Sequence, residues 1–109
     1  MIVVENSIEL KRIIKQRISE QGPNCNLNDI DVSKVKDMSW MFFGLQFNGD
    51  ISNWNVSSLL NMQRMFCDSK FNGDISRWNI SSKTGPWSMN GMFDKSPLDG
   101  KESSWYKEK

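Results

Sequence analysis

Apolar residues recur every three or four positions near the start of the chain, which predicts an amphipathic helix over residues 6–22. Asn6 is the expected N-cap, with Glu9 reaching back as in a capping box, and Gly22-Pro23 is the expected stop signal. A helix on a membrane surface is the alternative, but the stripe carries no aromatic residue, so a helix that covers the apolar residues behind it is favoured. The stripe consists of Leu10, Ile13, Ile14 and Ile18.

The remaining apolar positions repeat with a period of 24 residues. The pattern Phe-Asn-Gly-Asp-Ile-Ser-x-Trp-Asn-x-Ser-Ser occupies residues 47–58 and recurs at 71–82. Leu98 and Trp105 keep the gap of seven residues found between Phe47 and Trp54, and an insertion of three residues falls around 83–87. The chain therefore holds about four copies, the first and last of them degenerate. In the first copy the apolar slots hold Leu27, Ile30, Val32, Met38, Met41 and Phe42.

Each copy predicts a short strand and then a helical turn. Residues 51–56 are rich in Ile, Trp and Val and follow an Asn-Gly turn, whereas residues 57–66 carry apolar side chains at spacings of three and four. A repeat of this length cannot bury its apolar face alone and must stack on its copies. We therefore expect one α/β domain over 1–109, with a capping helix at 6–22, coils at 24–46, 47–70 and 71–97, and a degenerate C-terminal coil at 98–109.

The repeat resembles the BspA-type leucine-rich repeats of bacterial surface proteins. The likeness rests on the pattern at 47–58, on Asn61-Met62-x-x-Met65-Phe66 after it and on residues 31–42, and it covers residues 6–97. The resemblance implies a short right-handed leucine-rich-repeat-like solenoid of about four coils with an N-terminal capping helix. It also implies a role in adhesion or protein binding and no enzymatic activity.

The amino-acid composition limits the kinds of catalytic and metal site that the chain can form. The chain has no His, which excludes Ser-His-Asp and Cys-His nucleophilic systems within one chain and every zinc site that needs an imidazole. It has no Ala but 15 Ser and 11 Asn, a composition suited to a fold with many corners. No pair of carboxylates stands out as acid and base, and no glycine loop suits a phosphate. We expect no enzyme, no cofactor, no metal and no small-molecule substrate.

Targeting signals, cysteine spacing and net charge indicate where the protein is located in the cell and which classes of molecule it binds. Met1–Glu5 is too short an apolar run for a signal peptide, and no segment reaches membrane-spanning length, so a cytoplasmic protein of a bacterial host, without a membrane partner, is expected. Cys25 and Cys67 match no metal or redox spacing, and two buried thiols are favoured over a disulfide. With 14 bases against 13 acids the net charge is +1, which disfavours nucleic acid.

Aromatic and Asx residues in register have structural explanations. Trp54, Trp78 and Trp105 share one slot with Ile30 and are expected in the core, as are the rows of Met and Phe. A methionine-rich binding groove is the alternative for the Met rows. Asn48, Asn72, Asp50 and Asp74 suggest stacked calcium ligands, but Asx side chains that bond their own turns explain them more simply.

The residues that break the repeat are the candidate binding residues. Trp40 stands where later copies have Arg64 and Gly91, a slot expected to face solvent, although Trp40 packing under the helix is an equal alternative. Trp87 lies in the insertion and is expected to be exposed. Exposed Trp, Tyr and Arg are the residue types most enriched at interaction hot spots. The predicted partner-binding residues are Trp40, Phe43, Arg64, Trp87, Trp105 and Tyr106.

The leading functional hypothesis is a non-enzymatic protein–protein interaction module. The run from capping helix to degenerate last coil suggests a stand-alone product, for example a phage-encoded anti-CRISPR or other anti-defence inhibitor, in keeping with its size, its AT-rich composition and the missing export signal. The alternative is a bacterial surface or adhesion fragment. Nucleic-acid binding through the basic helix face at Lys11, Arg12 and Lys15 ranks last. A homodimer through an open solenoid end is a further expectation.

Overall fold

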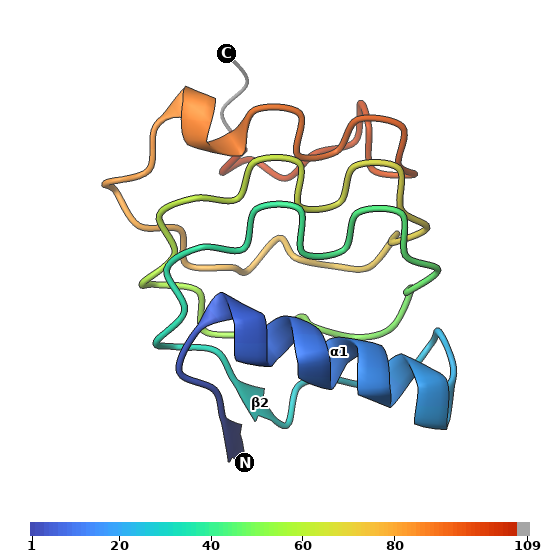
Figure 1. The fold of residues 1–109 in the computed structure, drawn as a ribbon. Helices are drawn as coiled ribbons and strands as arrows, with labels where there is room; N and C mark the ends of the chain where they lie inside the picture. Colours follow the sequence, from blue (N-terminus) through green and yellow to red (C-terminus); the bar gives the residue numbers. More distant parts are fainter. Residues whose placement is uncertain (107–109) are drawn as a thin grey trace.

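The computed structural model describes residues 1–106, so the last three residues of the predicted segment 98–109 lie outside the described part. Its elements, in chain order, are strand β1 (Ile2–Val3), helix α1 (Ser7–Gln21), strand β2 (Ile30–Asp31) and the 3-10 helix η1 (Pro86–Met89). β1 and β2 form a two-stranded parallel sheet, with Ile2 opposite Ile30. Segments without regular structure lie one above another beside α1 (Figure 1). No helix within residues 1–106 is long and apolar enough to cross a membrane.

Helix α1 begins and ends where the sequence predicts. The side chain of Asn6 accepts a hydrogen bond from the Glu9 amide at 2.9 Å. The Glu9 carboxylate accepts from the Glu5 amide at 2.8 Å, so the reciprocal half of the predicted capping box is displaced by one residue. Gly22 ends the helix with φ at 91°, a left-handed value that glycine adopts without steric cost, and its amide donates to the Ile18 carbonyl at 2.9 Å.

The predicted four-coil solenoid is wrong. Among residues 1–106 the strands are β1 and β2, of two residues each, so no stack of repeat strands forms a sheet. Residues 51–56, expected as a strand, run through turns, and residues 57–66, expected as a helical turn, contain no helix. The structure is instead a small compact fold with one α-helix and one short parallel sheet.

Asx turns explain why the expected strands are absent. An Asn or Asp side chain that accepts the amide two residues later bends the chain where a strand would have to continue. These bonds measure 2.8–3.1 Å, and at Asp50 and Asp74 they confirm the turn explanation. Asn48 differs, because its side chain accepts from the Asn72 amide in the next segment. The turns join Asn26 to Asn28, Asp31 to Ser33, Asp37 to Ser39, Asp50 to Ser52, Asn55 to Ser57, Asn61 to Gln63 and Asp74 to Ser76.

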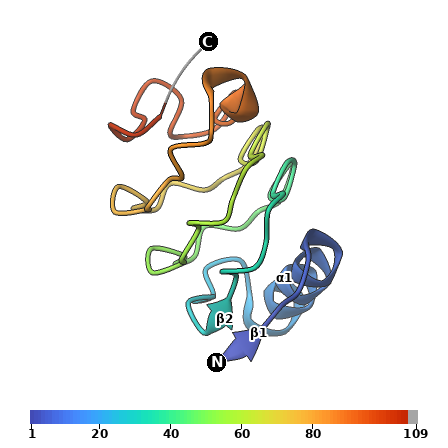
Figure 2. The same ribbon diagram turned by 90° about the vertical axis from the view of Figure 1, so that its left-hand side faces the viewer.

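Backbone hydrogen bonds alternate in direction along residues 38–45. The amides of Met38, Trp40 and Phe42 each donate to a carbonyl 23 positions later, in the neighbouring segment. The amides of Met41 and Phe43 instead turn back to the carbonyl three residues before them. Residues 62–69 repeat this alternation against residues 88–94. The segments are thus successive tight turns held side by side, and Figure 2 shows them stacked away from α1.

The predicted aromatic core is confirmed. Phe66 lies between Phe42 and Phe93, with ring centroids 5.3 and 5.7 Å away and the rings nearly parallel. The tryptophans stack in the same way, with Trp78 6.4 Å from Trp54. The indole N–H of each tryptophan in this row donates to a backbone carbonyl of the preceding segment. Trp78, for example, donates to the Ile51 carbonyl at 3.0 Å. The hydrogen bond removes the cost of burying a polar indole group, so large rings fill the interior without an unsatisfied donor.

The other interior predictions also have clear outcomes. Cys25 and Cys67 are free thiols and both are buried, as expected, and burial raises the pKa of Cys25. The methionines of the repeat lie inside the core rather than along a groove, which removes the methionine-groove alternative. These buried residues are Met38, Met41, Met62, Met65, Met89 and Met92.

The Asx turns predict an acid-sensitive fold. Hydrogen bonds from Ser52 and Ser76 lower the pKa of Asp50 and Asp74 below the ordinary value of 3.8. Because the folded pKa is the lower one, the stabilisation is complete above the unfolded value and is lost as pH falls through the folded pKa. We expect the thermal midpoint to be level above about pH 5 and to fall below about pH 4.

The matched variant for the acid effect is the double substitution Asp50→Asn and Asp74→Asn. An amide oxygen still accepts the serine hydrogen bonds but does not titrate, so the acid-induced loss should become shallower. Thermal melts across this pH range compare the two proteins. An unchanged acid profile would show that these two turns do not carry the effect.

Candidate functional site

Two repeated slots have left-handed backbone geometry, and one of them holds Trp40. The φ angles of Trp40, Arg64 and Gly91 are 61°, 56° and 66°, and these residues occupy the same place in successive segments. A second slot, at Gly44, Asp68 and Lys95, behaves alike. A left-handed residue with a Cβ costs roughly 1–2 kcal/mol relative to its usual geometry. The fold therefore holds a tryptophan in a conformation that favours glycine.

Trp40 and Arg64 of the first slot share one exposed surface with Phe43. Trp40 and Phe43 are 48% and 45% exposed, and their rings meet edge to face with centroids 5.0 Å apart. The Arg64 guanidinium lies 5.9 Å from the centre of the Trp40 ring and forms an ion pair with Asp94 at 3.1 Å. The Arg64 side chain also covers Gly91, where an added Cβ would come within 2.7 Å of it. We call Trp40, Phe43 and Arg64 the aromatic face.

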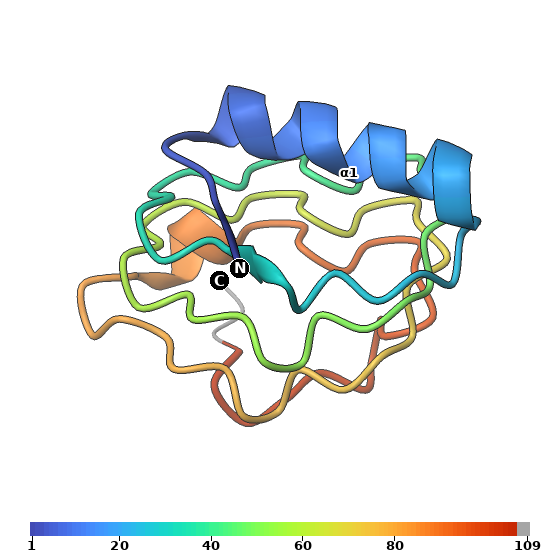
Figure 3. The same cartoon turned by 90° about the horizontal axis from the view of Figure 1, so that it is seen from below.

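A groove of about 490 Å³ separates the aromatic face from helix α1. The Lys11 ammonium reaches across it and donates to the carbonyls of Met41 and Trp40, the latter at 3.3 Å. Burial, and secondarily the charge of Lys15, lowers the pKa of Lys11. Figure 3 shows α1 lying along the neighbouring segments. The groove is lined by Ser7, Ile8, Lys11, Arg12 and Lys15 from α1 and by Ser39, Trp40 and Met41.

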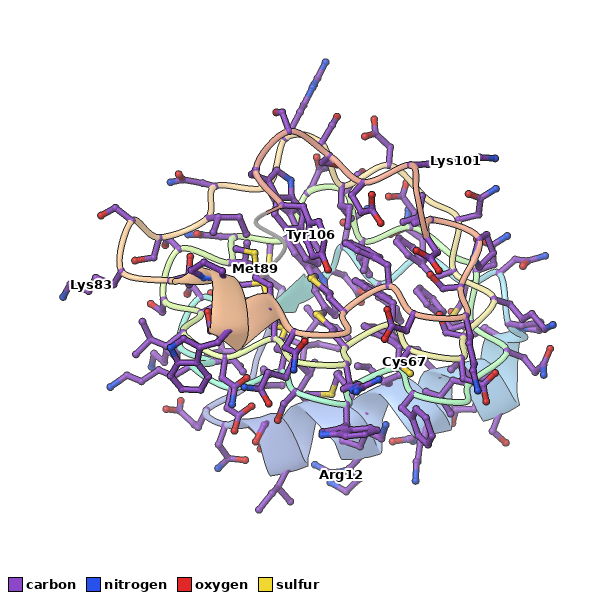
Figure 4. All side chains as sticks on the ribbon, turned by 90° about the horizontal axis from the view of Figure 1, so that it is seen from above. Arg12, Cys67, Lys83, Met89, Lys101 and Tyr106 are labelled. Carbon is purple, nitrogen blue, oxygen red and sulfur yellow. The ribbon has the colours of Figure 1, made fainter. Side chains whose placement is uncertain are left out.

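Trp40 combines the two alternatives that the sequence leaves open. It borders the groove beside α1, yet about half of its surface remains exposed. Figure 4 shows Arg12 and Cys67 on the α1 side of the molecule and Lys101 on the opposite side. Cys67 lies three residues after Arg64, whose guanidinium is 4.0 Å from its sulfur, so the aromatic face belongs to the α1 side.

The other predicted site residues lie elsewhere. Trp87 is 66% exposed in η1, and Gln63 links it to the aromatic face, since Gln63 donates to the Trp87 carbonyl and accepts from the Trp40 amide. Trp105 and Tyr106 are half-buried against the core. The Trp105 ring stacks on Trp78 at 6.1 Å, and the Tyr106 ring meets that of Phe93 edge to face at 5.1 Å. The structure thus brings together three of the six predicted residues.

The predicted site residues do not include Ile8 or Leu60, two of the exposed aliphatic residues. Ile8 is 82% exposed on α1 and lines the groove, and Leu60 is 44% exposed. The signal for Ile8 was present, because it is the aliphatic residue of the helix that lies outside the predicted stripe. An aliphatic side chain outside the buried stripe of a helix has no packing role to explain it.

The aromatic face and the groove together offer ring faces, an aliphatic side chain and cations. Within residues 1–106 no three His, Cys, Asp or Glu side chains cluster in a way that would hold a metal ion. Asp50 and Asp74, whose pKa values are lowered, are engaged in structural turns. Ring faces, an aliphatic side chain and cations instead suit contact with apolar and acidic groups of another molecule.

Substituting Trp40 separates backbone strain from the side chain. Trp40→Gly removes both the ring and the left-handed strain, whereas Trp40→Ala removes the ring and keeps the strain. We expect the glycine variant to be more stable than the alanine variant by about 1 kcal/mol. Chemical denaturation of both variants measures this difference. A glycine variant that is the less stable of the two would contradict the left-handed assignment.

Among curated proteins, and among solved structures, none matches this chain. Residues 9–109 match the family described as Mycoplasma protein of unknown function, DUF285. The match extends from the first turn of α1 through both left-handed slots and the aromatic core. The resemblance to BspA-type repeats stays a prediction beside it. The chain belongs to the DUF285 family.

Proposed function

We propose that this chain is a non-enzymatic protein-binding module that docks its partner on the aromatic face. One observation carries the proposal. Trp40 stays about half exposed in a left-handed position, where the same slot two segments later holds Gly91. Gly91 shows that glycine is accepted in this slot, yet Trp40 and Arg64 both keep a side chain there despite the strain, and both lie on the aromatic face, which points to a use for their side chains.

The composition of the face favours a protein partner. Trp and Arg are the residues most enriched at interaction hot spots, and here they adjoin a second exposed ring at Phe43. Arg64 is held in place by Asp94, so the ring and the guanidinium are presented in one arrangement before any partner arrives. A pre-organised surface loses less side-chain entropy on binding.

More specific functions than protein binding are supported by other observations. An inhibitor of a bacterial defence nuclease is a proposal based on size and composition, and a surface-adhesion fragment is the alternative. Nucleic acid ranks below both, because Lys11 already bonds two carbonyls and Arg64 is paired with Asp94. Among the described residues, Arg12 and Lys15 are then the unpaired cations that line the groove.

The test uses immobilised full-length protein and a lysate of the source organism. A protein retained by wild type is identified, purified and titrated against wild type, Trp40→Gly and Trp87→Ala by calorimetry. We expect Trp40→Gly to raise Kd by at least about tenfold, as for the removal of a hot-spot side chain. Trp87→Ala is the matched control, an exposed tryptophan outside the aromatic face.

Stability measurements make the comparison interpretable. Trp40→Gly should unfold cooperatively at a midpoint close to that of wild type, so weaker binding would report the lost ring. Equal Kd values for wild type and Trp40→Gly would contradict the proposal. A larger loss with Trp87→Ala would move the binding site to η1 and would contradict it as well.

A further inference from the structure

The groove beside the aromatic face has a one-sided charge. Three cations from one face of α1, Lys11, Arg12 and Lys15, line it, and no acidic residue does. They leave the rest of the chain with 11 bases and 13 acids, so the positive charge of a nearly neutral protein is concentrated here. Lys11 and Lys15 stand four residues apart, a spacing at which like charges destabilise a helix. Lys11 ties α1 to the carbonyls of Trp40 and Met41, whereas within residues 1–106 Arg12 and Lys15 form no ion pair.

Apolar side chains stand on both walls of the same groove. Ile8 projects from α1 with 82% of its surface exposed, and Trp40 forms the opposite wall. An aliphatic side chain and an indole across a groove of about 490 Å³ define a seat for an apolar side chain. Arg12 and Lys15 lie further along α1 from Ile8 and border that seat.

We propose that this groove takes an acidic segment of a partner protein, with one apolar side chain seated between Ile8 and Trp40 and carboxylates facing Arg12 and Lys15. The inference rests on the proposed function and specifies the chemistry of its partner. Charge complementarity selects the acidic segment, and the apolar walls require an anchor within it. Two of the three N–H donors of the Lys11 ammonium are taken by the carbonyls of Met41 and Trp40, so Lys11 contributes mainly through its charge.

A nucleic acid would use the same charges differently. Each phosphate neutralised by a cation adds a slope of about −0.9 to the logarithmic salt dependence of binding. With two unpaired cations, Arg12 and Lys15, the groove supports about two such contacts, far fewer than nucleic-acid binders use. The observations therefore favour the acidic polypeptide.

The test uses the full-length protein labelled with ¹⁵N and synthetic peptides of 12 residues. One set contains Glu and Asp around a single Trp, Phe, Leu or Met, and a matched set replaces every acid by Gln or Asn. Binding at up to millimolar peptide is followed through the amides of Ile8, Lys11 and Ser39 and the indole of Trp40. An oligo-dT of 12 nucleotides is the third probe.

We expect at least one acidic peptide to shift these groove signals and its amide counterpart to bind at least tenfold more weakly. The double variant Arg12→Glu, Lys15→Glu should weaken the acidic peptide at least tenfold. The double variant Lys83→Glu, Lys101→Glu carries the same charge change outside the groove and should bind like wild type. Absence of groove shifts with every acidic peptide, or equal binding of the amide set, would overturn the inference.

Two further outcomes separate this inference from the proposed function. Tighter binding of oligo-dT, with a salt slope steeper than two contacts allow, would overturn it in favour of nucleic acid. A partner whose affinity depends on Trp40 but is unchanged by Arg12→Glu, Lys15→Glu would overturn it while leaving the proposed function intact. A partner whose affinity depends neither on Trp40 nor on Arg12 and Lys15 would contradict both proposals.

Discussion

Phe66→Ala is expected to lower the free energy of unfolding by about 3–5 kcal/mol, the usual cost of removing a buried aromatic ring. Phe66 is fully buried at the centre of the aromatic core. Its ring contacts four others, those of Phe42, Phe71, Trp78 and Phe93, with centroids 4.6 to 6.3 Å away. No other ring could fill the space without breaking the parallel stacks, so a cavity would remain.

Phe43→Ala is the matched control, because it removes the same ring from an exposed position. Its cost should stay within about 1 kcal/mol, since roughly half of that ring is already in water. Urea denaturation of the two variants and the wild type measures the contrast. Similar losses for the two substitutions would contradict the assignment of Phe66 to the core and Phe43 to the aromatic face.

Gly49→Ala is expected to destabilise the fold by about 3 kcal/mol, at the upper end for a group forced into a packed site. A Cβ at Gly49 would lie 1.7 Å from the Cys25 carbonyl oxygen, and that contact is with backbone. The same carbonyl accepts the Asp50 amide at 3.2 Å, which joins two successive segments. The segments would have to move apart, and this hydrogen bond would lengthen with them.

Two other glycines provide a graded comparison. At Gly73 a Cβ would meet the Phe71 ring at 2.7 Å and the Gly49 carbonyl at 3.4 Å, so a side chain has to move rather than backbone. At Gly85 the nearest atom is 4.0 Å away, on Trp87, and Gly85→Ala should be tolerated. In thermal and urea unfolding, the loss of stability on substitution by Ala should be largest at Gly49, smaller at Gly73 and smallest at Gly85. A Gly49 variant as stable as the Gly85 variant would contradict the close backbone approach.

The buried residues of the fold were predictable from the sequence because apolar residues recur at equivalent positions of the repeat. A row such as Phe42, Phe66 and Phe93 recurs where identical rings stack, and helix α1 carries its own cap and stop residues. The path of the backbone was not predictable in the same way. Ile and Val favour strands, but the Asx bonds at Asp50 and Asn55 turn the chain within the same few residues. Local side-chain bonding overrode strand propensity there.

The sheet that does form was missed for a different reason. β1 pairs with β2 across almost thirty residues, and each strand has two residues. Two residues are too few to show the alternation that marks a strand, so nothing in the sequence of Met1–Glu5 signals the pairing. Its position depends on where α1 packs, which is a property of the whole fold.

The candidate site was predicted in part. Trp40 and Phe43 stood out because they break the repeat, Arg64 because it shares the slot of Trp40 and is a residue type enriched at hot spots, and the structure places the three on one surface. The groove was not predictable, since it exists only where Ile8 and the cations of α1 face Trp40. Trp105 stood out near the chain end, but its ring continues the tryptophan stack and its indole N–H bonds the Ile75 carbonyl at 2.9 Å.

Site-specific photocrosslinking in the source organism tests directly whether the aromatic face binds a partner protein. A photoreactive phenylalanine analogue replaces Phe43, within the aromatic face, or Lys101, which Figure 4 shows on the opposite side. Crosslinked proteins are identified by mass spectrometry and counted with and without the additional substitution Trp40→Gly. We expect one dominant protein joined to position 43, lost with Trp40→Gly and absent from position 101. The same crosslinked proteins at both positions, unaffected by Trp40→Gly, would contradict it.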